Sequence, residues 1–279
     1  MVMRSIGIEF RKNMHPIFSL ISCLGIVILC LLNVGYTTPS GKGYTILELL
    51  VSAKRSTLLT SAELNRYQIY QMAMNGYITL LLPMIVSLGY VYVTASEKSN
   101  GAIRFLLIRE GKIKYSLSKT ISAMLSSGCT LVLGYLILGI IIYLKFPAPS
   151  EYGVAPSFMS DLSELQLLAI RFVQMFIYGM RVSLIAIYTT IFFTDKYILM
   201  CLPVMLNYVI REVESRLWTT FVMRSEKITK FIDSIRMDAV IRVDGKIGTM
   251  SVWLVLLLMV PAVILTYISL SGDGRYALE

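Results

Sequence analysis

Long uncharged apolar runs constrain this chain more than any other feature of its sequence. Five such runs are present, over residues 16–34, 72–95, 120–144, 172–194 and 247–270. Arg181 is the one charge inside them. A helix needs about 20 apolar residues to cross about 30 Å of hydrocarbon, and each run is close to that length or longer. We therefore expect an all-α integral membrane protein.

A sixth apolar run, residues 197–210, is shorter than the others. At 1.5 Å per residue it rises about 21 Å, which is less than the hydrocarbon thickness. It is either a re-entrant half-span or the start of a longer helix that continues to residues 217–223. In the longer helix, Glu212 and Arg216 would pair one turn apart. We predict six crossings, because an even number places both termini on the same side.

Composition supports this class and excludes others. Apolar residues make up 56% of the chain and charged residues 15%, whereas soluble domains have about 45–50% and 25%. All four cysteines lie in apolar runs, which argues against a disulfide framework. His15 is the one histidine in the sequence, so we expect neither a multi-histidine metal site nor histidine-dependent catalysis.

The distribution of charge predicts the orientation. The net charge is +9, and basic residues in short loops mark the cytoplasmic side of a membrane protein. The loop at residues 96–119 is the most basic, with Lys98, Arg104, Arg109, Lys112, Lys114 and Lys119. The loop after the third run is acidic. We therefore place the 96–119 loop and both termini in the cytoplasm, and we interpret the positive charge as a membrane signal, with no nucleic-acid partner.

Residues 102–108 within this loop form a short apolar stretch between charges, which predicts a small surface helix. Asn100-Gly101 supplies a turn before it, and Gly111 a stop after it. On pattern alone, the loop is equally well interpreted as a basic segment that holds lipid headgroups.

The same loop resembles the first cytoplasmic loop of bacterial type-2 ABC exporter permeases. The resemblance rests on Glu97-Lys98-x-Asn100-Gly101-x-x-Arg104-Phe105-Leu106-Leu107. In addition, Glu9-Phe10-Arg11-Lys12, within residues 1–15, resembles the amphipathic connecting helix of that family. The sequence departs from the family at Arg109-Glu110-Gly111-Lys112, where many members have Arg-Pro.

This resemblance implies a permease subunit of an ATP-driven exporter in a bacterial plasma membrane. A separate ATP-binding cassette ATPase would hold ATP and Mg, and a second permease copy or a sister permease would complete the transporter. The expected cargo is amphiphilic: an antimicrobial peptide, a drug or a lipid. The loop residues that would couple to the ATPase are Glu97, Lys98, Gly101, Arg104, Phe105 and Arg109.

The residues also bear on two other function classes. An enzyme is not expected, because the five long runs contain no Asp, Glu or His, and intramembrane catalysis needs such groups. Gly41-Lys42-Gly43 lacks the spacing and the hydroxyl of a phosphate-binding loop, so no cofactor is expected in this chain. A secondary transporter or channel is the alternative, although coupling ions normally need intramembrane carboxylates or broken helices.

Polar residues in the fourth run share one helical face. Arg171, Gln174, Tyr178 and Arg181 follow helical spacing. A charge at that depth is costly and normally faces a cavity or the bundle interior. The stripe is either a pathway wall that contacts an anionic group, or a structural arginine site with Glu212 or Glu214 as partner.

Residues 211–246 form the last polar segment before the final span of a single transmembrane domain, 1–279. It is either an amphipathic or re-entrant cap on the outer side or a solvated loop. As an outer gate, its candidate residues are Glu212, Glu214, Arg216 and Trp218. In the third run, small residues four apart predict close helix packing; these are Ser118, Ser122, Ser126, Thr130 and Gly134.

Overall fold

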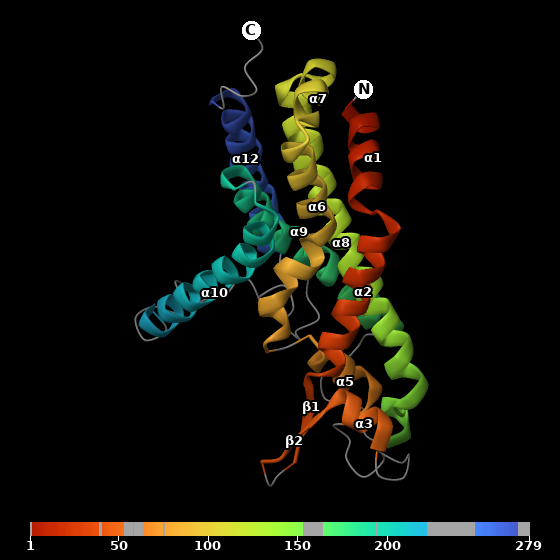
Figure 1. The fold of residues 1–279 in the computed structure, drawn as a ribbon. Coiled ribbons are helices and arrows are strands. Elements are labelled where there is room, and N and C mark those ends of the chain that lie inside the picture. Colours follow the sequence, from red (N-terminus) through yellow and green to blue (C-terminus); the bar gives the residue numbers. More distant parts are fainter. Residues whose placement is uncertain are drawn as a thin grey trace.

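The computed structural model is a bundle of long helices with a small folded layer at one end (Figure 1). It describes residues 2–38, 41–52, 58, 64–74, 76–152, 164–193, 195–221 and 249–272. The elements are α1 (Val2–Asn13), α2 (Pro16–Leu31), β1 (Val34–Thr37), β2 (Gly43–Thr45), α3 (Ile46–Ser52), α5 (Arg66–Met72), α6 (Ile78–Ser99), α7 (Ala102–Glu110), α8 (Lys112–Lys145), η2 (Pro149–Tyr152), α9 (Glu164–Phe192), α10 (Lys196–Phe221) and α12 (Thr249–Gly272).

Four of these helices are long and apolar enough to cross a membrane by themselves: α6, α8, α9 and, over Trp253–Leu270, α12. The pair α1 and α2 qualifies jointly as a fifth, bent by 63° at the break. The described residues therefore confirm a largely helical chain with several possible spans. Helix α10 is not among the helices that are long and apolar enough to cross a membrane, so the six crossings stay a prediction.

The helix in the first apolar run is shorter than the run itself, which extends over residues 16–34. Helix α2 stops at Leu31, and the following residues form β1, which pairs antiparallel with β2. The hydropathy pattern of the run gives no sign of this hairpin. The register pairs Val34 with Thr45, Tyr36 with Tyr44 and Thr37 with Gly43, which gives backbone polar groups on the facing edges of the two strands hydrogen-bond partners.

The second apolar run is divided by a turn. Helix α5 ends at Met72, and α6 begins only at Ile78. Gly76 between them has φ +72°, a left-handed conformation that glycine adopts without a steric penalty. The Asn65 side chain caps α5 by accepting a hydrogen bond from the Gln68 amide at 2.8 Å. The span therefore runs from Ile78 to Ser99 instead of 72–95.

Helix α8 is the longest element, and it extends past any single bilayer crossing. Its 34 residues rise about 51 Å. In its C-terminal half, α8 binds α5 through two reciprocal hydrogen bonds. The Tyr70 hydroxyl donates to the Tyr135 carbonyl at 2.8 Å, and the Tyr135 hydroxyl donates to the Tyr70 carbonyl at 2.9 Å. The two rings stack with centroids 4.0 Å apart.

A second contact fastens this end layer to α9. The Arg66 guanidinium donates two hydrogen bonds of 2.7 Å to the two carboxylate oxygens of Glu164. Such bidentate pairs are geometrically specific. The layer of β1, β2, α3 and α5 is thus fixed to the bundle and is not an independent domain.

Small residues allow the central helices to approach closely, as the spacing in the third run predicted. A Cβ on Gly179 of α9 would lie 2.9 Å from the Gly128 Cα of α8. The predicted stripe of α8 is buried, and its Gly134 faces Ile26 of α2. The close packing predicted from small residues is confirmed within one chain.

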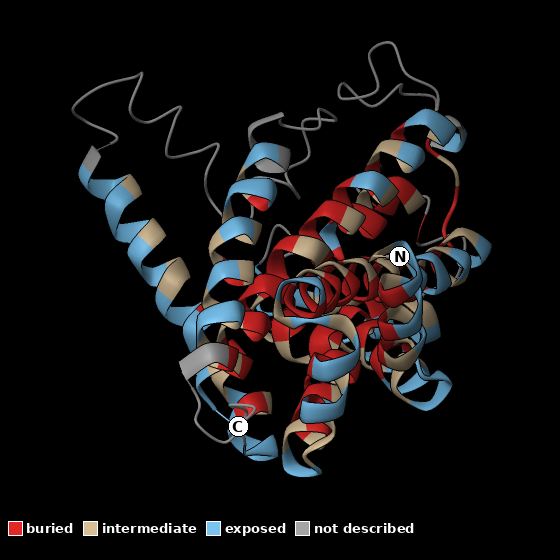
Figure 2. Cartoon of the chain, turned by 90° about the horizontal axis from the view of Figure 1, so that it is seen from above, coloured by how far each residue is buried: buried red, intermediate tan, exposed pale blue. Residues whose placement is uncertain are grey.

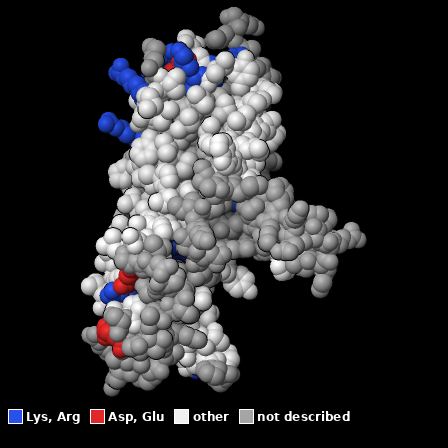
Figure 3. Space-filling model, turned by 180° about the vertical axis from the view of Figure 1, so that it is seen from behind, with Lys and Arg blue, Asp and Glu red and all other residues white. Residues whose placement is uncertain are grey.

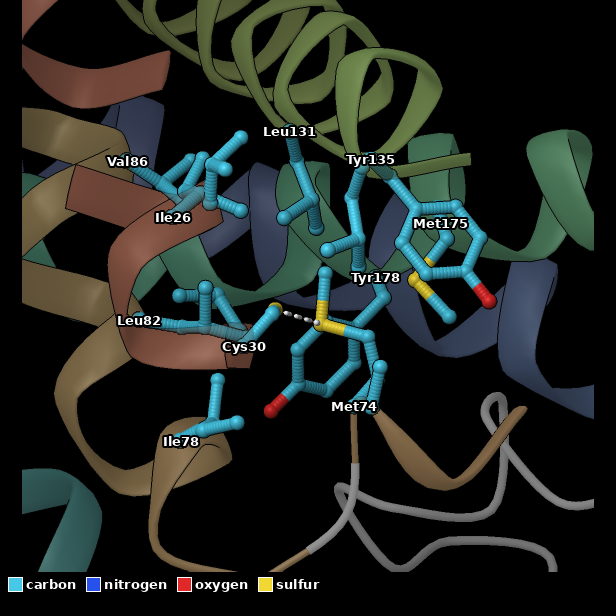
Figure 4. Close-up of a cluster of buried hydrophobic side chains, with 14 of the residues drawn as sticks. Ile26, Cys30, Met74, Ile78, Leu82, Val86, Leu131, Tyr135, Met175 and Tyr178 are labelled. Atoms are coloured by element: carbon cyan, nitrogen blue, oxygen red, sulfur yellow. Dashed lines mark hydrogen bonds between the residues drawn. The ribbon is translucent and has the colours of Figure 1, made fainter. Parts of the chain in front are cut away.

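The core lies between α2, α6, α8 and α9. Figure 4 shows part of it, where Cys30 points toward Met74 with their sulfur atoms 3.9 Å apart. Ile26, Leu82 and Leu131 pack around them, and all three are fully buried. Figure 2 shows buried residues on the inner sides of the central helices and exposed residues on the outlying ones. Many exposed side chains on α2 and α12 are large and apolar, which suits contact with lipid.

Candidate functional site

The short helix α7 caps one end of the bundle, beside the start of α1 and the end of α12 (Figure 1). Gly101 (φ +67°) and Gly111 (φ +78°) flank it in left-handed conformations. Ile103 and Leu107 are buried against Tyr115 and Leu270. The helix predicted over 102–108 is confirmed, and it extends from Ala102 to Glu110.

The opposite face of α7 is open. Phe105 is 77% exposed and Ile108 62%, and the neighbouring Arg104 is also exposed. A large aromatic side chain with a neighbouring arginine is the composition that protein interfaces favour at their centre. Within the 96–119 loop that the sequence predicts to couple to a partner, this face is therefore accessible to another protein.

Beneath α7 lies a ring of four charges from three helices, which we call the charge ring: Glu9, Lys12, Glu97 and Lys119. The Lys119 Nζ lies 2.8 Å from Glu9 Oε2 and 2.5 Å from Glu97 Oε2. The Lys12 Nζ lies 2.6 Å from Glu9 Oε1 and 3.0 Å from Glu97 Oε1. Each ammonium thus contacts both carboxylates, and each carboxylate uses one oxygen for each ammonium.

Three of the four side chains of the charge ring are buried, while that of Lys12 is 36% exposed. The side chains of Lys119 and Glu9 are each 3% exposed, and Glu97 is 11% exposed. The Tyr115 hydroxyl also donates to Glu97 at 3.3 Å. Burying charges is costly unless each is paired and hydrogen-bonded. The closed ring meets that condition, because positive and negative charges are equal in number.

The ring connects the two helices that flank α7. Glu97 lies near the end of α6 and Lys119 near the start of α8, while Glu9 and Lys12 belong to α1. Asn13 of α1 adds a hydrogen bond to Ser122 of α8 at 3.3 Å. The ring therefore ties the ends of α6 and α8, which flank α7 in the chain, to α1.

The six residues predicted for partner coupling do not share one environment. Glu97 is in the charge ring, and Lys98 donates a hydrogen bond to the Thr190 carbonyl of α9. Gly101 forms the turn. Arg104 and Phe105 are exposed, and Arg109 contacts Glu110 at 2.8 Å. The structure thus gives Glu97 and Lys98 internal contacts and leaves the α7 residues at the surface.

The polar stripe of α9 faces the bundle interior, as its spacing predicted. Arg171, Gln174, Tyr178 and Arg181 are all buried. Arg171 donates to the side-chain amide oxygen Oε1 of Gln174 at 3.1 Å. The Tyr178 hydroxyl donates to the Thr79 carbonyl of α6 at 3.4 Å. The sequence allows either a pathway wall or a structural role for this stripe. These contacts within the bundle are of the structural kind.

The predicted outer residues lie on α10, which leaves the bundle at an angle (Figure 1). This helix continues unbroken from Lys196 to Phe221, so the longer of the two predicted alternatives is confirmed. Arg216 donates to Glu212 at 2.7 Å, the predicted pair one turn apart. Glu214 and Trp218 are half-buried. The rest of the 211–246 segment, from residue 222 onward, lies outside the described residues.

Charged side chains divide the bundle into two unlike ends. Figure 3 shows most of the visible Lys and Arg gathered at the end that carries α7, and most of the visible Asp and Glu at the other end, where they lie beside basic side chains. In the ranges that the structure describes, no group of three or more His, Cys, Asp or Glu side chains is placed to hold a metal ion. Neither protein-family models nor curated proteins match the sequence. The geometry therefore carries the functional argument.

Proposed function

We propose that this chain is the permease subunit of an ATP-driven exporter, with a separate ATPase that docks on α7. The observation that carries the proposal is the exposed face of α7, whose buried face packs on Tyr115, a hydrogen-bond donor to Glu97 of the charge ring. The cargo is an amphiphile, in keeping with the large apolar surface of the bundle. An antimicrobial peptide, a drug and a lipid all have that character.

In this mechanism the chain converts a push on α7 into helix movement. Because the ring ties α1, α6 and α8 together, a force on α7 moves their ends as one unit. The far ends of α5, α8 and α9 stay fixed to one another by Tyr70, Tyr135, Arg66 and Glu164. ATP binding in the partner would bias two arrangements of these helices.

The proposed orientation places the basic end in the cytoplasm of a bacterial cell. Arg4, Arg11, Arg104 and Lys114 are exposed at this end, and basic loops stay on the cytoplasmic side. The start of α1 and the end of α12 lie there too (Figure 1). Both termini are therefore cytoplasmic in the proposal, which is also where ATP is available to a partner.

One substitution on α7 tests the coupling. We expect Phe105→Asp to reduce ATPase association and permease-dependent ATP hydrolysis by at least about tenfold, as expected for an aromatic residue at an interface centre. The measurement is co-purification of the full chain with ATPases encoded beside it, followed by ATP hydrolysis in nanodiscs. Glu97 is unsuitable for this test, because its loss would disturb the charge ring.

Val51→Asp is the matched control. Val51 is 80% exposed on α3, at the opposite end of the molecule, and its change should leave ATP hydrolysis intact. If no ATPase associates, or if the ATPase hydrolyses ATP as fast with Phe105→Asp as with the control, the exporter proposal is wrong. Transport driven by an ion gradient without ATP would instead support a secondary transporter, for which the buried carboxylates Glu9 and Glu97 are the observation in favour.

A further inference from the structure

A cavity of about 300 Å³ opens between α1, α7 and the start of α8, at the basic end of the bundle. Its volume is at the lower end of the range for small-molecule sites. The cavity is separate from the exposed face of α7, since Arg104, Phe105 and Ile108 are not among its walls. Its lining residues are Val2, Arg4, Ser5, Ile8, Arg109, Glu110 and Lys114.

The charge of the lining favours an anion. Three cationic side chains, Arg4, Arg109 and Lys114, face a single carboxylate, Glu110. That carboxylate already accepts hydrogen bonds from Ser5 and from Arg109. The walls therefore hold an excess of two positive charges, which a phosphate group would neutralise.

The rest of the lining is apolar. Val2 and Ile8 of α1 border the same cavity, and Met3 and Ile113 beside it are strongly exposed apolar side chains. An inorganic anion would make no use of these groups. A ligand with a phosphate and an attached hydrocarbon chain would use both parts of the site.

We propose that this cavity binds the headgroup of an anionic phospholipid from the adjacent leaflet. Arg4, Arg109 and Lys114 would meet the phosphate, and Val2 and Ile8 the beginning of an acyl chain. Basic pockets between helices on the cytoplasmic side of membrane proteins accept such headgroups. A lipid seated there joins α1 to the α7–α8 corner. The inference does not depend on an ATPase partner.

The test is lipid retention by the full chain, measured by native mass spectrometry. The purified protein is equilibrated with equal amounts of phosphatidylglycerol and phosphatidylcholine that have the same acyl chains. We expect at least about tenfold preference for phosphatidylglycerol, because each basic residue near an anionic lipid contributes about 1 kcal/mol. Arg4→Gln with Lys114→Gln should remove that preference.

Arg11→Gln with Lys112→Gln is the matched control, since it removes the same charge from the same two helices outside the cavity. It should keep the preference, as should Arg4→Lys with Lys114→Arg. An equal loss in both Gln pairs would mean diffuse attraction and would overturn the proposal. So would a wild-type chain without preference, a result that needs no variant. Displacement of phosphatidylglycerol by millimolar inorganic phosphate would show a site for phosphate alone and would also overturn it.

Discussion

Replacing Lys119 with methionine is expected to lower the free energy of unfolding by about 3–5 kcal/mol, the cost of breaking a buried ion pair by removing one partner. Methionine fits the volume of the lysine stem but supplies no charge. Glu9 and Glu97 would then share the single ammonium of Lys12, and one of their charges would be buried without compensation. Thermal unfolding in an uncharged detergent measures the effect.

The partner substitution separates charge balance from packing. Glu97→Gln added to Lys119→Met leaves Glu9 and Lys12 as a neutral pair, so the double variant should be more stable than Lys119→Met alone. Lys114→Met, an exposed change on the same helix, should alter stability by less than about 0.5 kcal/mol. If Lys119→Met unfolds at the same temperature as Lys114→Met, the charge ring does not hold these helices together.

The second large effect is expected at the contact between α8 and α9. Gly179→Val should destabilise the bundle by about 3 kcal/mol, the upper part of the range for overpacked cores. A Cβ at this position would lie 2.9 Å from the Gly128 Cα and 3.0 Å from the Ser127 carbonyl oxygen. These are backbone atoms, so the two helices must separate to admit the new side chain.

Gly7→Val on α1 is the matched control for this prediction. No atom lies within 4 Å of a Cβ built on Gly7, and valine has a better helix propensity than glycine. This variant should therefore be as stable as the native chain or slightly more stable. Comparable destabilisation by both changes would mean that Gly179 does not set the distance between α8 and α9.

Much of the fold could be predicted from the sequence, because lipid imposes a simple rule on the segments that cross it. A segment in hydrocarbon must be apolar and helical, so long uncharged runs located α6, α8, α9 and α12 directly. The rule fails where the chain leaves the lipid. The hairpin after Leu31 depends on the pairing of β1 with β2, and Asn33 donates hydrogen bonds to the Met72 and Ala73 carbonyls beside the turn at Gly76. Nothing in a hydropathy pattern encodes these contacts.

The candidate site was only partly accessible to sequence reasoning. The turn glycines and the apolar core of α7 are local signals, and they located that helix. The charge ring joins Glu9, Glu97 and Lys119, which are far apart in sequence and come together only when α1 packs on α8. Each looked like an ordinary charge near a membrane surface. Lys119 directly before an uncharged run of 25 residues was the one available hint of burial.

The balance of the charge ring has an electrical consequence. Moving one elementary charge across a membrane potential of 100 mV involves about 2.3 kcal/mol. Two carboxylates and two ammonium groups that shift as a unit carry no net charge with them. A shift of these four groups along the membrane normal would thus be electrically silent, and the resting potential of a cell would neither drive nor oppose their displacement.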